Sequence, residues 1–109
     1  MQFVYEGCWI DKKESQIFTV RLEDKCQQLM KNEKKSRYKM RNNPAQKCKN
    51  CAIENGYVLF GLLNGGECWA GDLGVDYMKN GRAWPCNEKG TESAMAVYKI
   101  TGNMNKNLL

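Results

Sequence analysis

The stretch NNPAQKCKNCAIENGYVLFGLLNGGECWAG, residues 42–71, decides the fold because a helix, a strand and a tight turn follow one another in it. Its first part has the marks of a helix. Asn43 stands at the N-cap, Pro44 occupies the first helical position, and Gly56 ends the element. Small residues recur at helical spacing and form one stripe, which consists of Ala45, Cys48 and Ala52. The pattern predicts a helix with one buried face.

The segment after this helix is typical of a buried strand followed by a hairpin. Tyr57–Leu63 is too short and too continuously apolar for a surface helix, so we expect a strand that is buried on both faces. Residues 64–66, NGG, turn the chain, and Glu67–Gly71 returns beside the first strand. A helix that leads into a central strand is therefore the predicted core.

The two ends of the chain predict further strands. Gln2–Tyr5 is an expected opening strand, and the polar run around Gly7 in EGCWIDKKES predicts a turn after it. The late segment AMAVYKIT alternates, which predicts a closing strand. Its two faces are Met95, Val97 and Lys99 on one side and Ala96, Tyr98 and Ile100 on the other.

Between these elements the sequence predicts one more helix and an irregular loop. Cys26, Leu29 and Met30 share a helical face, so a helix is expected to begin near Asp24. Glycines at positions 71, 74 and 81 predict irregular structure with at most one helical turn at Val75–Met78, and the tail 103–109 is expected to fray. The predicted class is a single α+β domain over residues 1–109, with one or two helices packed on an antiparallel sheet and its core within 5–100.

Six cysteines in 109 residues indicate a framework of up to three disulfides, which stabilise small domains with modest cores. The expected disulfide cysteines are Cys8, Cys26, Cys48, Cys51, Cys68 and Cys86, and the sequence alone does not choose their pairing. Disulfides predict an oxidising compartment, so we expect a secreted or extracellular protein. A small cytosolic thiol protein, the alternative, predicts six free thiols.

The N-terminus MQFVYEGCWI lacks the features of a secretory signal, so we interpret the chain as a mature or excised module. No apolar stretch approaches the roughly 20 residues that span a bilayer, and no membrane span is predicted.

The CKNC motif, Cys48 to Cys51, has two alternative interpretations, a redox pair or half of a zinc site. A thioredoxin-like pair needs a βαβ setting with the motif at the start of its helix, whereas both cysteines lie inside the predicted helix. A zinc site usually needs a second close pair, but the other cysteines are scattered singly and the chain contains no histidine. We predict that the two cysteines bridge to different parts of the fold and that the protein holds no metal or cofactor.

The net charge of +5 is concentrated in one segment. From Lys25 to Lys49 the basic residues are opposed only by Glu33. Such a segment can attract anionic surfaces, although charge runs usually just face water and a solvated helix and loop is the more ordinary explanation. The candidates for anionic-surface binding are Lys31, Lys34, Lys35, Arg37, Lys39 and Arg41. We expect no nucleic-acid partner.

Several kinds of catalysis are excluded or disfavoured. The absence of histidine excludes Ser-His-Asp and Cys-His mechanisms. Glu67 and Asp72 near Trp69 could be the carboxylate pair of a glycosidase, but carboxylates are common in loops, and a general acid needs burial that a glycine-rich rim seldom provides. We therefore predict no enzymatic activity.

Aromatic residues bordered by amides and carboxylates are the better candidates for function. Tryptophans adjacent to cysteines often pack on disulfides in the core, and this is the alternative for Trp9, Trp69 and Trp84. Of the three, we expect Trp69 and Trp84 to be partly exposed. The candidate ligand-binding residues are Asn64, Glu67, Trp69, Asp72, Tyr77 and Trp84. Trp69 would stack on a sugar ring, and Asn64, Glu67 and Asp72 would hydrogen-bond its hydroxyls.

Taken in order, YEGCWID, NPAQKC, CAIENGYVLFGLLNGGECWAG, Cys86 and a closing VYKI resemble the WSC domain and WSC-like modules of secreted and cell-surface proteins. The resemblance covers residues 5–100. Two departures are that Ala70 stands where the family has a second cysteine, and that Cys26 has no clear counterpart. The family's disulfide pattern therefore does not transfer whole, although a bridge from Cys48 or Cys51 to Cys68 is expected.

The resemblance implies a compact extracellular α+β module without enzymatic activity, often one of several copies in an adhesive or receptor protein. Such modules are often regarded as carbohydrate-binding. The expected partner is a glycan or an extracellular matrix component, including acidic polysaccharides. The alternative is a structural, adhesive or defensive protein-interaction domain that uses its basic segment on anionic surfaces.

Overall fold

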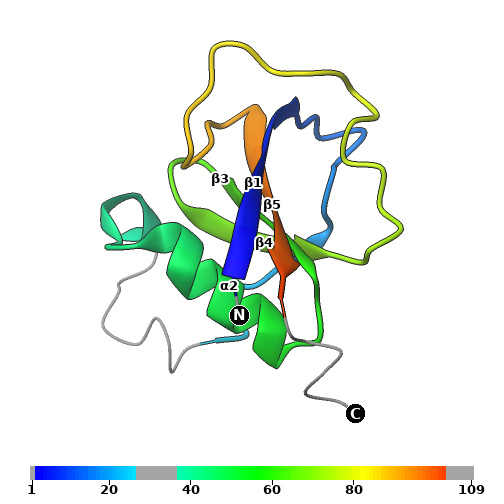
Figure 1. Ribbon diagram of the computed structural model, residues 1–109. Coiled ribbons are helices and arrows are strands. Elements are labelled where there is room, and N and C mark those ends of the chain that lie inside the picture. Colours follow the sequence, from blue (N-terminus) through cyan, green and yellow to red (C-terminus); the bar gives the residue numbers. More distant parts are fainter. Residues whose placement is uncertain (1, 27–36, 103–109) are drawn as a thin grey trace.

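The computed structural model describes residues 2–26 and 37–102. Five strands form one antiparallel sheet in the order β1-β5-β3-β4-β2, and the helix α2 lies across one face of it (Figure 1). The elements in chain order are β1 (Gln2–Ile10), β2 (Val20–Arg21), the short 3-10 helix η1 (Arg37–Met40), α2 (Pro44–Glu54), β3 (Leu59–Leu63), β4 (Glu67–Gly71) and β5 (Ala94–Thr101). The predicted fold, a helix packed on an antiparallel sheet, is confirmed.

The central segment folds as its local pattern predicts. α2 begins at Pro44, the strand β3 is buried along its whole length, and β4 returns beside it as a hairpin. One local detail differs. Asn43 occupies the N-cap but adopts a left-handed backbone (φ 52°) and makes no side-chain capping bond, so its backbone conformation and not its amide group starts the helix. Cys48 and Ala52 of the predicted stripe are fully buried.

The prediction of a turn at Gly7 is wrong, because β1 continues through this position to Ile10. The register with β5 passes from Tyr5 opposite Tyr98 to Gly7 opposite Val97, so Glu6 is the extra residue of a β-bulge. Gly7 adopts φ 101°, a conformation that few other residues tolerate. Glycine therefore bends this strand without ending it.

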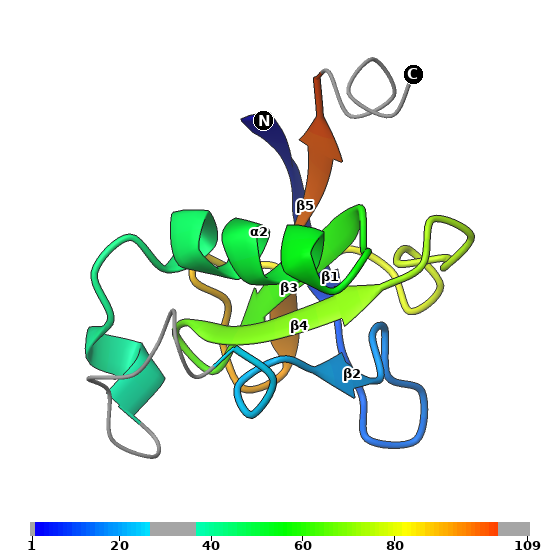
Figure 2. The same ribbon diagram turned by 90° about the horizontal axis from the view of Figure 1, so that it is seen from below.

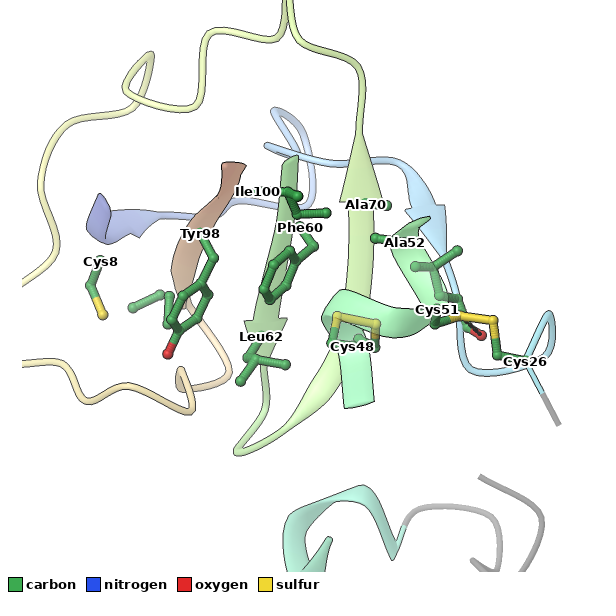
Figure 3. Packing of buried hydrophobic residues seen from close by; sticks show 14 of the residues in the cluster. Cys8, Cys26, Cys48, Cys51, Ala52, Phe60, Leu62, Ala70, Tyr98 and Ile100 are labelled. Atoms are coloured by element: carbon green, nitrogen blue, oxygen red, sulfur yellow. Dashed lines mark hydrogen bonds between the residues drawn. A yellow bond between two sulfur atoms is a disulfide. The ribbon is translucent and has the colours of Figure 1, made fainter. Parts of the chain in front are cut away.

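The core on the helix side of the sheet is built from aromatic rings and cysteines. Phe60 and Tyr98 stack at 5.0 Å between ring centroids, and Phe3 meets both rings edge-on. Cys48 and Cys51 of α2 lie over the sheet beside these rings (Figure 3). Ala96, Tyr98 and Ile100 of β5 all belong to this side, as their alternation predicts.

The opposite face of the sheet is covered by the segment between β1 and β2, which contributes Ile17 and Phe18. Phe18 is buried over two glycines on neighbouring strands. A Cβ atom at Gly61 would lie 3.1 Å from the Phe18 ring and 2.5 Å from Met95 Sδ, and one at Gly71 would overlap the ring. The absence of side chains at these two positions makes room for Phe18.

Three disulfides fasten this framework, and they use all six cysteines. Cys48 joins α2 to Cys68 of β4, Cys51 joins α2 to Cys26 after β2, and Cys8 joins β1 to Cys86. The two cysteines of the CKNC motif therefore bridge to different parts of the fold, and the expected bridge to Cys68 is the one made by Cys48. Three disulfides indicate folding in an oxidising environment, whereas a free-thiol protein would lack them.

Some predictions concern residues outside those described. Residues 23–25 form a turn, closed by a hydrogen bond from Lys25 N to Leu22 O, and most of the helix expected near Asp24 lies outside the described residues, as does the tail 103–109. The region Val75–Met78 contains turns. Within residues 2–26 and 37–102, no helix combines the length and the apolar character that crossing a bilayer requires.

Candidate binding surface

The carboxylate of Glu67 holds two other predicted site residues, Asn64 and Trp69, at the start of β4. Asn64 Nδ2 and Trp69 Nε1 each donate a hydrogen bond of 2.9 Å to Glu67 Oε1, and Arg21 Nε donates one of 2.8 Å to Oε2. Burial alone would raise the pKa of Glu67, but the hydrogen bonds from Trp69, Arg21 and Asn64 hold it below its ordinary value. The carboxylate is therefore ionised at neutral pH, and it fixes the indole.

This geometry changes the role that Glu67 can take in a binding site. Its side chain is buried and both oxygens already accept hydrogen bonds, so it is poorly placed to bind sugar hydroxyls directly. Trp69 is half-buried against the face of the sheet opposite α2. Glu67 therefore positions the Trp69 indole and the Asn64 amide.

Asp72 and Tyr77 lie apart from this cluster. Asp72 follows the far end of β4, and a five-residue strand extends about 17 Å. Tyr77 packs edge-on against Trp9, with ring centroids 5.7 Å apart, and its hydroxyl donates to Glu6 Oε2 at 3.3 Å. Burial, together with the neighbouring Glu6 carboxylate, raises the pKa of Tyr77. Neither residue shares a contact with Asn64 in the described hydrogen-bond network.

Trp84 is the most exposed large apolar side chain in the described part of the chain, with 89% of its surface accessible. The loop is fastened to β1 just before and just after Trp84 in the chain. Ala83 N donates a hydrogen bond to Cys8 O at 3.0 Å, and Cys86 forms a disulfide with Cys8. A shallow pocket of about 630 Å³ opens beside this loop. It is lined by Tyr5, Cys86, Asn87, Glu88 and Lys89.

A second shallow pocket of about 540 Å³ connects this region to the hairpin turn. It is lined by Lys39, Asn64, Gly65, Asn87, Lys89, Thr91 and Glu92, so Asn87 and Lys89 border both pockets. The two pockets therefore meet at Asn87 and Lys89, with Asn64 lining the one at the hairpin turn and Cys86 lining the one beside the Trp84 loop. Sequence reasoning missed Tyr5 and residues 87–92, because no local pattern marks a polar loop as part of a surface that the sheet assembles.

The side chains of two of the predicted basic residues, Arg41 and Lys39, lie within the described part of the structure. Arg41 is buried, with 1% of its side chain accessible, and its guanidinium binds both carboxylate oxygens of Glu23 and the carbonyl of Gly66. Its inclusion among the anionic-surface residues is therefore wrong, because this charge is neutralised inside the protein. Lys39 is exposed. The side chains of Lys31, Lys34, Lys35 and Arg37 lie outside the described part of the structure.

No model of a known protein family matches the chain, and no curated protein matches it. The geometry establishes a small cysteine-rich domain with three disulfides on an antiparallel sheet.

Proposed function

We propose that this protein is a non-catalytic, extracellular carbohydrate-binding module whose ring-stacking residue is Trp84. The observation that carries the proposal is the 89% exposure of an indole on a loop that a disulfide and a backbone hydrogen bond fasten to β1. Tryptophan is usually well buried in folded proteins. A flat apolar ring presented to water from a fastened loop is therefore suited to contact a ligand.

The pocket beside the Trp84 loop has the chemistry that a sugar requires. A sugar ring offers an apolar face of C–H groups and a rim of hydroxyls. The indole can cover the apolar face, while the amide of Asn87 and the carboxylate of Glu88, both at the adjacent pocket, can bind hydroxyls. Tyr5, 43% exposed, adds a second aromatic surface at the same pocket.

Two further observations support an extracellular binding module. Three disulfides suit an oxidising compartment. The order of motifs from YEGCWID to VYKI resembles WSC-like modules, and the Cys48–Cys68 bridge agrees with the helix-to-sheet connection that the resemblance leads us to expect. On this basis we propose membership of the WSC-like group and a glycan or matrix component as partner.

The test is a glycan array probed with the oxidised protein at low salt and at about 0.5 M salt, where charge contacts between exposed groups are screened. We expect Trp84→Ala to abolish salt-resistant binding to neutral glycans. Leu73→Ala is the matched control, because Leu73 is 63% exposed in a different loop. Trp69→Ala tests whether the Trp69 indole, rather than that of Trp84, stacks on the sugar.

Neutral-glycan binding that survives Trp84→Ala but is lost in Trp69→Ala would move the site to β4. Binding to no glycan at all would overturn the proposal and favour the alternative, a structural or protein-interaction domain. Circular dichroism of each variant confirms that the fold is retained.

A further inference from the structure

The pocket between the hairpin turn and the loop 87–92 brings together two lysines that are distant in sequence. Lys39 comes from η1 and Lys89 from the loop before β5, and both are exposed at the pocket. Asn64, Asn87 and Thr91 add uncharged polar groups, and Glu92 contributes one carboxylate. The lining therefore carries a net positive charge surrounded by hydrogen-bonding side chains.

The backbone beneath this pocket is held in a fixed arrangement. Asn64 N donates to Thr91 O at 2.9 Å, and Gly65 N donates to Gly90 O at 3.1 Å, so the hairpin turn is bonded directly to the loop. Gly90 adopts φ 75°, and a Cβ atom there would overlap the carbonyl of Leu62. The close approach of loop and hairpin thus depends on glycine at this position.

Each lysine is positioned by its own local contact. The aliphatic part of Lys39 lies over Gly65, where an added Cβ would lie 3.4 Å from its Cγ atom. The backbone of Lys89 is fixed by a hydrogen bond of 2.8 Å to the side chain of Asn87. These contacts hold the stem of Lys39 and the backbone of Lys89 at one pocket before any ligand binds, which lowers the entropic cost of binding.

We propose that this pocket binds an anionic oxygen group of a sugar, a carboxylate or a sulfate ester, so that the ligand of the module is an acidic polysaccharide. The inference rests on the proposed function, because it extends the glycan surface from Trp84 through the shared residues Asn87 and Lys89. Lysine ammonium groups bind such anions as point charges, and the neighbouring amides and hydroxyl bind the rest of the sugar.

The experiment measures binding of the oxidised full chain to immobilised heparin, to a polyuronate without sulfate and to a neutral glucan, each at several salt concentrations. We expect Lys39→Gln combined with Lys89→Gln to weaken binding to an acidic chain about tenfold or more, and to reduce the slope of log K against log salt by about two, since two counterion contacts are lost. Comparison of heparin with the polyuronate identifies whether sulfate or carboxylate is preferred.

Two variants make this test specific to the pocket. Lys13→Gln combined with Lys79→Gln removes the same charge from exposed positions elsewhere and should leave affinity nearly unchanged. Glu92→Gln removes the one carboxylate of the pocket and should strengthen binding to acidic chains severalfold. An equal loss in both lysine pairs would overturn the proposal in favour of unspecific charge attraction.

The outcomes also separate this inference from the proposed function. If Trp84→Ala abolishes binding to the neutral glucan while the pocket lysines do not matter for acidic chains, the ring-stacking site stands and the acidic pocket is wrong. If the substitutions at the pocket lysines weaken binding to acidic chains and Trp84→Ala changes no binding, the anion-binding pocket stands and the ring-stacking site is wrong. Binding to none of the three polysaccharides overturns both.

Discussion

Two carboxylates organise the hairpin edge: Glu67 is buried, and the side chain of Glu23 is 11% exposed. Glu23 accepts hydrogen bonds from both terminal nitrogens of Arg41 and from the backbone N–H of Cys68 at 2.7 Å, whereas Glu67 accepts from Arg21, Asn64 and Trp69. Each brings together residues that are far apart in sequence. Their contributions can be measured separately, because Glu23 binds a buried cation and Glu67 a partly exposed one.

Glu23→Gln should destabilise the protein by about 3–5 kcal/mol, because it removes the carboxylate from beside a buried guanidinium. The matched control is Asp24→Asn. Asp24 pairs with Arg21 at 3.4 Å but is 87% exposed, and such pairs contribute only about 0–1 kcal/mol. Urea denaturation at neutral pH measures the loss of unfolding free energy in both variants. Equal losses in the two variants would contradict a special role for the buried pair.

Glu67→Gln should remove part of the pH dependence of stability. The folded-state pKa of Glu67 lies below its ordinary value of 4.5, so its ionised form stabilises the fold above about that pH. This contribution is lost as the pH falls through the folded-state pKa. The gap in unfolding free energy between wild type and variant should therefore be constant near neutrality and narrow below about pH 4.5.

Denaturation curves at pH values from about 3 to 7 measure this gap. Trp69→Phe is the companion variant, because it keeps an aromatic ring but deletes one of the three donors to the carboxylate. Trp69→Phe should show a smaller gap in unfolding free energy from wild type than Glu67→Gln, and that gap should also narrow at low pH. A gap that does not change with pH would show that the hydrogen bonds do not stabilise the ionised form.

At the scale of secondary-structure elements, packing on the face of the sheet opposite α2 depends on two glycines under Phe18. Gly71→Ala should lower the free energy of unfolding by about 1–3 kcal/mol. The new methyl group would overlap the Phe18 ring, which the surrounding core prevents from moving aside. Gly74→Ala is the control: nothing lies within 4 Å of an added Cβ there, so stability should be unchanged or slightly higher.

Thermal or urea denaturation of the two alanine variants tests this prediction. A third measurement identifies the cause. Combining Gly71→Ala with Phe18→Leu should cost less than the sum of the two single changes, since the smaller side chain leaves room for the methyl group. Strict additivity would mean that Gly71 contributes through backbone conformation and not through the space it leaves.

The elements that the sequence predicts well are those specified by neighbouring residues. The proline at the start of α2, the apolar run of β3 and the NGG turn each act within a few positions. The extension of β1 past Gly7 could not be predicted in this way. A glycine with positive φ ends a strand in one context and forms a bulge in another, and pairing with β5, about 90 residues away along the chain, decides between them.

The candidate site likewise combines features that local sequence indicates with features that depend on residues distant in the chain. Trp69 and Trp84 both lie close to a cysteine, and local sequence distinguishes them poorly, yet one is half-buried and the other almost fully exposed. The burial of Arg41 depends on Glu23, which lies 18 positions earlier. Residues that a pocket shares between distant loops, such as Lys39 and Lys89, are revealed only by the assembled sheet.

At the scale of the whole molecule, the three disulfides close loops of very different length. The cross-linked cysteines are separated by 20, 25 and 78 positions, and they connect β1, the region after β2, α2, β4 and the Trp84 loop. The helix and the sheet form two layers (Figure 2). Two of the three disulfides start from the helix, at Cys48 and Cys51. The layers are therefore held together by covalent bonds as well as by packing.

Complete reduction should unfold the domain under otherwise native conditions. By the chain-entropy estimate each bridge contributes about 3–4.5 kcal/mol, and together they approach the whole stability of about 5–15 kcal/mol that is typical of a folded domain. Near-ultraviolet circular dichroism should lose its aromatic signal on reduction and regain it on reoxidation. Alkylated protein that keeps this signal would show that packing alone sustains the fold, and the inference of an oxidising compartment would then lose its thermodynamic basis.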